Sequence, residues 1–198
     1  LLQPFAARRT EIMFGILGSR TDMEYMINIS TYNCAEERCV GDVYHAFLDY
    51  AFSQANFFML VFANYYGKGL PARAKQIQKE LKPFRVKSRT NPSWPGVLET
   101  YCPNTTYKIN FYHCCDESKI FLHEFDKLSD WSRPRNAEDL AFFKNNQCWF
   151  YSVGHEKIAA FLHATSRDMQ FIKEHALLDS PRLCPYDRYY DAYNEELL

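Results

Sequence analysis

The chain has 198 residues, of which 47% are hydrophobic and 24% are charged, and its formal net charge is −1. This length and balance fit one globular domain, and the near-neutral charge argues against a protein that is basic overall and coats nucleic acid. The 16 Phe, 14 Tyr and 3 Trp supply enough large apolar surface for a substantial core.

The cysteines and the apolar segments indicate in which cellular compartment the protein resides. Seven cysteines are present, an odd number, and no signal-peptide pattern opens the sequence, so we expect reduced thiols in a cytoplasmic protein. Residues 1–12 are interpreted as a tag or an upstream extension. The apolar run 57–62 is much shorter than the roughly 18–20 residues of a membrane span, so no membrane association is expected.

The first predicted elements are short strands and a helix. Residues 13–18 predict a strand, and 22–29 an irregular or strand-like segment. Apolar residues at intervals of three and four then predict a helix that begins with Asp42 as its N-cap and ends near residue 53. The continuous apolar run of 57–64 is typical of a strand buried on both faces, although one long helix through both segments is an alternative.

Prolines delimit the next elements. Pro71 suits the first turn of a helix over 71–82, and Pro83 ends that helix. The following segment, 85–89, is interpreted as a strand. Two prolines and a glycine in 91–96 predict a rigid loop.

A strand and a helix are predicted next. Residues 105–113 alternate between apolar and polar positions, with Tyr107, Ile109 and Phe111 on one face, which predicts a strand. Asp116 is predicted to cap a helix over 116–128. Its apolar stripe is expected to comprise Ile120, Phe121, Phe125 and Leu128.

The last third of the chain begins with a hairpin pattern. Segments 140–143 and 147–152 flank two asparagines, which suit a tight turn between antiparallel strands. A third strand is predicted over 158–163. Thr165 or Ser166 then caps a helix over 166–177.

These elements predict one α+β domain over 13–180, with a mixed or antiparallel sheet and helices packed on it. Residues 181–198 form an acidic, tyrosine-rich tail that is expected to be solvated. The switch from a period of three or four residues to a period of two supports the mixed class.

The three tryptophans lie beside prolines or within a predicted strand, and each is predicted to be buried. Trp94 opens a Trp-Pro-Gly triplet before the strand over 105–113, and Trp131 opens a second recognisable stretch. The two stretches resemble uncharacterised bacterial proteins that carry the pattern W..P..EDL.FF…W…S..HE, over residues 40–178. The resemblance implies a bacterial accessory or phage-related origin and no known activity. The residues that carry it in the second stretch are Trp131, Pro134, Glu138, Asp139, Leu140, Phe142, Phe143, Cys148, Trp149, Phe150, Ser152, His155 and Glu156.

Four polar residues form the candidate catalytic set. His155 and Glu156 follow a predicted strand and a glycine, where an imidazole and a carboxylate could act as general base. Together with Glu138 and Asp139 they suggest a hydrolase or nuclease, but the HExxH and D/E-x-K patterns are missing. In the interpretation that we prefer from the sequence, His155 and Glu156 fix their loop by hydrogen bonds to Trp131 or to backbone, and the two acids cap a loop.

A second cluster contains metal-binding residue types. Residues 113–116 read His-Cys-Cys-Asp, and His123 follows them. A structural zinc site usually needs two separated pairs, and Cys34 and Cys39 could supply the second only if the fold brought them close. We therefore expect unligated thiols, and no metal or cofactor.

Basic residues concentrate between Lys68 and Arg89, where eight of them face one acid, Glu80. Such a segment could contact a nucleic acid, a nucleotide or an acidic protein, and it could equally be the solvated face of a helix. The candidate partner-binding residues are Arg73, Lys75, Lys79, Lys82, Arg85, Lys87 and Arg89.

The sequence therefore favours a non-catalytic protein that binds another macromolecule, more readily a protein than a nucleic acid. The resemblance places it in a bacterial or phage accessory system, such as defence, counter-defence or toxin–immunity. A hydrolase or nuclease using the four polar residues is one alternative. A nucleic-acid or nucleotide binder using the basic segment is the other.

Overall fold

A computed structural model describes residues 24–29, 37–98 and 100–198. In this part of the chain eight strands form one sheet in the order β3-β4-β2-β5-β6-β7-β1-β8, and neighbouring strands pair antiparallel. The predicted α+β class is confirmed. The strands are β1 (Tyr25–Asn28), β2 (Phe57–Asn64), β3 (Arg85–Thr90), β4 (Thr106–His113), β5 (Glu138–Lys144), β6 (Gln147–Val153), β7 (Ile158–Phe161) and β8 (Cys184–Pro185). The α-helices are α1 (Asp42–Gln54), α2 (Ala72–Glu80), α3 (Asp116–Leu122) and α4 (Ser166–Glu174).

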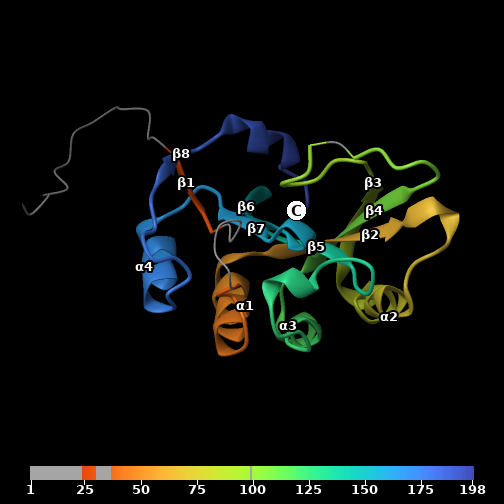
Figure 1. Cartoon of the computed structure of the whole chain (residues 1–198), viewed down its shortest axis with the longest axis horizontal. Coiled ribbons are helices and arrows are strands. Elements are labelled where there is room, and N and C mark those ends of the chain that lie inside the picture. Colours follow the sequence, from red (N-terminus) through yellow and green to blue (C-terminus); the bar gives the residue numbers. More distant parts are fainter. Residues whose placement is uncertain (1–23, 30–36, 99) are drawn as a thin grey trace, which may run out of the picture.

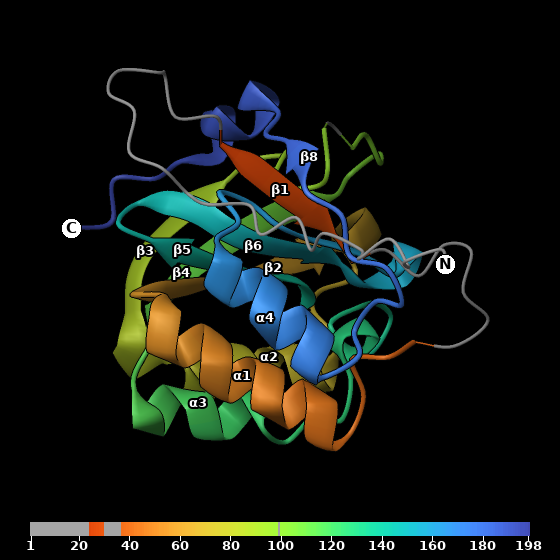
Figure 2. The same ribbon diagram turned by 90° about the vertical axis from the view of Figure 1, so that its left-hand side faces the viewer.

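The four α-helices cover one face of the sheet (Figure 1). In the view turned by 90°, α1 and α4 lie side by side beneath the strands, and α3 lies beyond α1 (Figure 2). Tyr50 of α1 links these two helices, because its ring stacks on Phe171 at 4.4 Å and its hydroxyl donates to Asp168. The helices thus form one layer against the sheet. No helix in the described residues is long and apolar enough to cross a membrane.

β2 lies inside the sheet between β4 and β5, which explains its unbroken apolar sequence. Phe58 and Phe62 pack in the helix-side core, whereas Phe57 and Met59 pack in a second cluster on the opposite face. The alternative of one long helix is wrong, because Ala55 already has extended backbone dihedrals. The predicted strand is confirmed at the same two ends.

The face without α-helices is covered by two irregular segments, the loop 91–98 and the C-terminal residues 184–197 (Figure 1). Tyr186, Tyr190 and Leu197 pack against the second cluster, and β8 pairs with β1. The expectation of a solvated tail is therefore wrong for this segment. Its tyrosine rings cover apolar sheet surface that would otherwise face water.

The predicted helices are confirmed, but several of their ends differ. Gly41, with a φ of 55°, occupies the N-cap position that was predicted for Asp42, which is the first helical residue. Cys115 likewise occupies the N-cap position predicted for Asp116. Thr165 caps α4 as predicted, in a capping box with the residue three positions later.

α3 ends at Leu122 rather than near residue 128. Phe125 and Leu128 still reach the core, but Phe125 does so from the turn after α3, where it packs 4.2 Å from the ring of Trp131, and Leu128 from a short 3₁₀ helix, Leu128–Asp130. Ile120, a member of the predicted apolar stripe, is 63% exposed because the short helix turns that side to solvent. α2 and α4 are also shorter than the predicted 71–82 and 166–177.

The hairpin β5–β6 is confirmed, with its turn at Asn145 and Asn146. Both asparagines have positive φ, 49° and 67°, as a tight hairpin turn requires. β5 begins at Glu138, so Glu138 and Asp139 lie within the strand and not in a loop before it. The strand predicted over 13–18 lies outside the described residues.

All three tryptophans are buried, as predicted. Trp94, Trp131 and Trp149 are 2%, 0% and 4% exposed. Trp94 belongs to the cluster on the face without helices, and the other two belong to the helix-side core. Trp94 can therefore report separately on the face that carries the site described next.

Candidate functional site

The candidate site begins at an irregularity in β5. The register between β2 and β5 shifts between Met59 and Val61, and Asp139 has a φ of 54°. A bulge of this kind lets successive residues depart from the usual alternation across the sheet. Here it buries both acids at the start of the strand, with Glu138 3% exposed and Asp139 fully buried.

Asp139 ties three segments together. One carboxylate oxygen accepts a hydrogen bond from Trp94 Nε1 at 2.7 Å, and the other accepts one from the backbone N–H of Gly154 at 3.0 Å. Burial raises the pKa of Asp139 to about 7, although these two hydrogen bonds favour the ionised form. Because both of its carboxylate oxygens already accept hydrogen bonds, Asp139 has a structural role and connects these segments. Other residues line the cleft that is described below.

Gly154 begins the 3₁₀ turn η4 (Gly154–Glu156) after β6 and packs directly on the chain at Trp131. A Cβ at Gly154 would lie 2.1 Å from the carbonyl oxygen of Trp131, which already accepts the backbone N–H of Asp139. These contacts leave no space for a side chain. The turn is therefore fixed through Gly154 and Asp139.

His155 and Glu156 do not play the fixing role expected from the sequence. His155 Nε2 lies 3.6 Å from Glu156 Oε1, and their side chains are 36% and 49% exposed. Within the described residues neither side chain is hydrogen-bonded to Trp131 or to backbone. Both side chains are thus partly accessible to a ligand.

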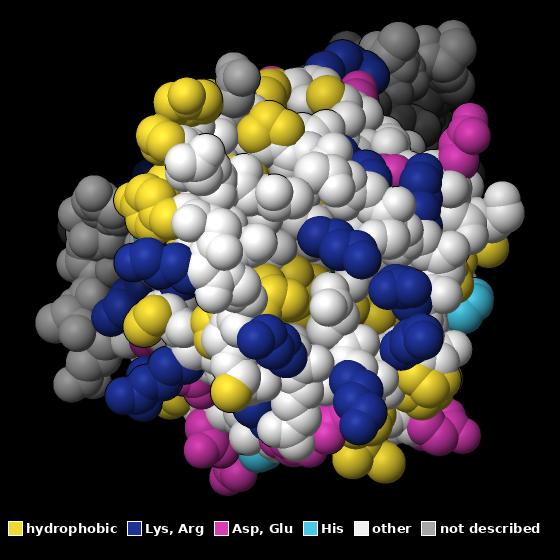
Figure 3. Space-filling model, turned by 90° about the vertical axis from the view of Figure 1, so that its right-hand side faces the viewer, with side chains coloured by type: hydrophobic (Ala, Val, Ile, Leu, Met, Phe, Trp, Pro, Cys, Tyr) yellow, Lys and Arg dark blue, Asp and Glu magenta, His cyan; other side chains and the backbone are white. Residues whose placement is uncertain are grey.

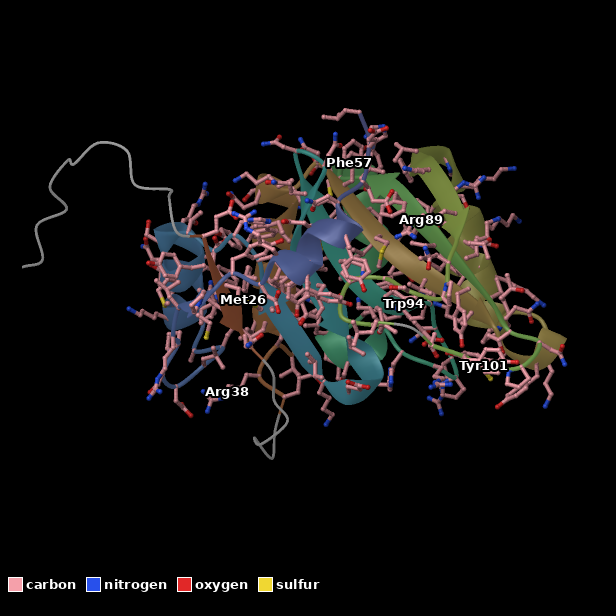
Figure 4. All side chains as sticks on the ribbon, turned by 90° about the horizontal axis from the view of Figure 1, so that it is seen from above. Met26, Arg38, Phe57, Arg89, Trp94 and Tyr101 are labelled. Carbon is pink, nitrogen blue, oxygen red and sulfur yellow. The ribbon has the colours of Figure 1, made fainter. Side chains whose placement is uncertain are left out.

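A cleft of about 300 Å³ lies between the loop 91–98, the start of β5 and η4. Its polar lining residues are Tyr65, Thr100, Arg133, Glu138, His155 and Glu156, with Trp94 beside them. Viewed onto the face without helices, Trp94 lies over the middle of the sheet, while Tyr101 lies at its margin (Figure 4). The cleft combines a buried carboxyl group with more exposed charged groups.

Glu138 is the most unusual group in the cleft. Tyr65 donates its hydroxyl to Glu138 Oε2 at 3.1 Å, whereas Oε1 has no hydrogen-bond partner in the described part of the chain. Burial raises the pKa of Glu138, and the Tyr65 hydroxyl and the charge of Arg133 act in the opposite direction. A carboxylate with one unsatisfied oxygen at a cleft is well placed to receive a donor from a ligand.

Arg133 covers this arrangement from the solvent side. Its guanidinium lies 4.7 Å from the centre of the Tyr65 ring, and its side chain is exposed. No described residue forms an ion pair with it. Arg133 therefore offsets the charge of Glu138 without being held firmly to it.

The structure thus gathers the four predicted polar residues around one place, but in different roles. Glu138, His155 and Glu156 line the cleft, and Asp139 supports it from below. Tyr65 and Arg133 were missed. Arg133 precedes a proline inside the recognised W..P pattern, which was a usable signal, whereas nothing near Tyr65 in the sequence pointed to Glu138.

The basic segment does not form one uniform surface. Arg73 is paired with Glu124, and both Lys87 and Arg89 approach Glu195, at 2.9 and 2.7 Å. The end of the molecule that carries α2 displays scattered lysines and arginines with hydrophobic side chains between them, and acidic side chains mostly toward its margins (Figure 3). The remaining candidates, Lys75, Lys79, Lys82 and Arg85, have no acidic partner among the described residues.

The cysteine-rich segment offers no metal centre in the part of the chain that the structure describes. No group of three or more His, Cys, Asp or Glu side chains there is close enough to hold an ion. Burial raises the pKa of the Cys114 thiol, which favours its neutral form. Cys34 lies outside the described residues.

Comparison with known proteins places the chain in no family. No family model, no curated protein and no solved structure matches it. The function must therefore be inferred from the chemistry of the cleft.

Asp139→Ala and His155→Ala should differ clearly in stability. Asp139→Ala leaves the Trp94 indole N–H and the Gly154 N–H without buried acceptors, so we expect the free energy of unfolding to fall by about 2 kcal/mol or more. His155→Ala removes a partly exposed side chain and should change it by less than about 0.5 kcal/mol. Urea unfolding of both variants measures the difference. Equal losses would mean that His155 carries a structural contact after all.

Proposed function

We propose that the protein is a non-catalytic binding protein that recognises another protein by holding one of its basic side chains in the cleft at Glu138. The observation that carries this proposal is the carboxyl group of Glu138, which is 3% exposed, lines the cleft and has one oxygen without a donor among the described residues. A guanidinium or ammonium group would supply donors and opposite charge to that oxygen.

The surroundings of Glu138 support a basic ligand group. Glu156 contributes a second carboxylate at the rim, and Tyr65 presents an aromatic ring that can pack against a guanidinium, as Arg133 now does. The cleft, at about 300 Å³, has the size of a site for one long side chain or a small ligand. A cation at Glu138 would also be shielded from bulk water, which strengthens the attraction.

Three features favour binding over catalysis. Both oxygens of Asp139 are occupied by protein donors, and among the described residues the His155 imidazole is paired only with the partly exposed Glu156. No serine or cysteine is among the described residues that line the cleft. The cytoplasmic setting and the bacterial or phage accessory system, such as defence, counter-defence or toxin–immunity, are part of the proposal and derive from sequence composition and resemblance alone.

Titration with N-acetyl-argininamide tests the proposal directly, because the chain has three tryptophans and only Trp94 lines the cleft. We expect its indole N–H signal to shift in a heteronuclear NMR spectrum, with a dissociation constant on the order of 1–10 mM, while the signals of Trp131 and Trp149 stay in place. The neutral analogue N-acetyl-citrullinamide should bind more weakly. Glu138→Gln should weaken binding of the arginine compound at least about tenfold.

Glu80→Gln is the matched control, since it removes one carboxylate from α2, away from the cleft. It should leave the titration unchanged. The proposal fails if the arginine compound leaves Trp94 unaffected, or if Glu138→Gln and Glu80→Gln weaken binding equally. The latter result would indicate a diffuse charge effect.

A hydrolase is the second candidate, favoured by one observation. Glu138, whose pKa is raised by burial, lines the same cleft as His155, and Glu156 lies 3.6 Å from that imidazole. An acid and a base in one cleft are the minimum for acid–base chemistry. Turnover of nitrophenyl esters, phosphates or glycosides that both Glu138→Gln and His155→Ala abolish, with folding intact, would favour this candidate.

A further inference from the structure

We propose that the cleft at Glu138 and a neighbouring apolar cavity form one binding site divided by Arg133, and that its ligand is an extended peptide segment with a basic and an apolar side chain. The inference rests on the proposed function, because it assumes that a basic side chain enters the cleft. It adds the second half of the ligand and a role for Arg133.

The second cavity adjoins the cleft and shares three of its lining residues. It measures about 250 Å³, and Tyr65, Arg133 and Glu138 line both spaces. The rest of its wall is mainly apolar, including Ala63, Leu70, Pro71, Ala74 and Pro134. One space therefore suits a cationic group and the other an apolar group.

The divider between the two spaces is a side chain that can move. Arg133 is exposed and lies over the Tyr65 ring, and no described residue holds it in an ion pair. A cation–π contact at an exposed site contributes only about 0.5–1 kcal/mol. A ligand cation can take its place over Tyr65 and beside Glu138 at little cost, and the two spaces then become continuous.

The two spaces together reach the size range of small-ligand sites, about 300–1,000 Å³. An extended peptide points every second side chain in the same direction, at a separation of about 6.6–6.8 Å. Side chains two positions apart can therefore enter the two spaces from one side. The acids in one space and the apolar wall of the other specify a basic and an apolar residue in this spacing.

Short peptides test the inference. The panel contains acetylated, amidated Leu-Gly-Arg and Arg-Gly-Leu, with Gly-Gly-Arg and Arg-Gly-Gly as references. The direction in which the peptide lies decides which of the two leucine peptides fits both spaces. We expect that peptide to bind about tenfold tighter than the glycine reference of the same order, because its leucine side chain is buried. The indole signal of Trp94 reports on the cleft, and the methyl signals of Ala63 and Ala74 report on the cavity. The leucine peptides should shift the methyl signals more than their glycine references do.

Arg133→Ala supplies the second arm of the experiment. Without the Arg133 guanidinium, a ligand cation no longer has to displace it from the Tyr65 ring. Binding of the basic peptides should therefore tighten about two- to fivefold, which is the free energy of that cation–π contact expressed as a ratio of dissociation constants. Arg135→Ala is the matched control, because Arg135 is exposed, close in sequence and lines neither space. It should not tighten binding.

The outcomes separate this inference from the proposed function. Equal affinity of the leucine and glycine peptides, with a normal Trp94 response, would overturn the joint site and leave the proposed function standing. Weaker binding in Arg133→Ala would show that Arg133 holds the ligand, which overturns its role as a displaceable divider. If no peptide affects Trp94, the proposed function itself is wrong.

Discussion

Gly154→Ala is expected to lower the free energy of unfolding by about 3 kcal/mol or more, one of the two largest effects that we predict for a single substitution. The added Cβ would lie 2.1 Å from the Trp131 carbonyl oxygen and 3.2 Å from the Cβ of Ser132. Backbone atoms cannot rotate away as a flexible side chain can, so the turn and the start of β5 must separate. Chemical unfolding measures the loss, and the Trp94 indole signal should shift as the hydrogen bonds of Asp139 are disturbed.

Gly67→Ala is the matched control for this substitution. Gly67 has a positive φ of 69°, but no atom of the described residues lies within 4 Å of a Cβ at that position. Its replacement should therefore cost only the backbone strain, about 1–2 kcal/mol. A loss from Gly154→Ala no greater than that from Gly67→Ala would show that η4 can move away from Trp131 easily.

Trp131→Ala should lower the free energy of unfolding by about 3–5 kcal/mol. The side chain is fully buried, packs 4.2 Å from the ring of Phe125 and donates its indole N–H to the hydroxyl of Tyr44 at 3.0 Å. Alanine would leave a large cavity in the helix-side core and remove that hydrogen bond. Thermal and urea unfolding should agree on the loss.

Trp131→Phe distinguishes packing from hydrogen bonding. Phenylalanine refills most of the cavity but cannot donate to Tyr44, whose own hydroxyl still donates to the carbonyl of Leu122. We expect roughly half of the alanine effect, because cavity size sets most of the cost. A phenylalanine variant as unstable as the alanine variant would make the hydrogen bond the dominant contribution.

Local patterns were sufficient for most of the sheet. The unbroken apolar run 57–64 marked a strand buried on both faces, and the two asparagines at 145–146 marked the β5–β6 turn. These features depend on residues adjacent in sequence. The side chain at each position, together with its immediate neighbours, decides between a period of two and a period of three or four residues.

The ends of elements and the fate of the C-terminal segment were decided by contacts between distant residues. α3 stops at Leu122, and Phe125 reaches the core from the following turn, where it packs on Trp131. The acidic segment after residue 181 looked solvated by composition. It folds back because its tyrosines cover the open face of the sheet and Glu195 meets Lys87 and Arg89.

The sequence by itself determined the α+β class, the burial of the tryptophans and four of the polar residues around the cleft, Glu138, Asp139, His155 and Glu156. Those properties follow from composition, periodicity and local turn chemistry. Only the tertiary structure decided that Asp139 supports the site while Glu138 faces the cleft, and that Tyr65 and Arg133 belong to it. The physical reason is that a bulge in β5 and contacts across the sheet set the direction and burial of each carboxyl group, and both depend on partners far away in the chain.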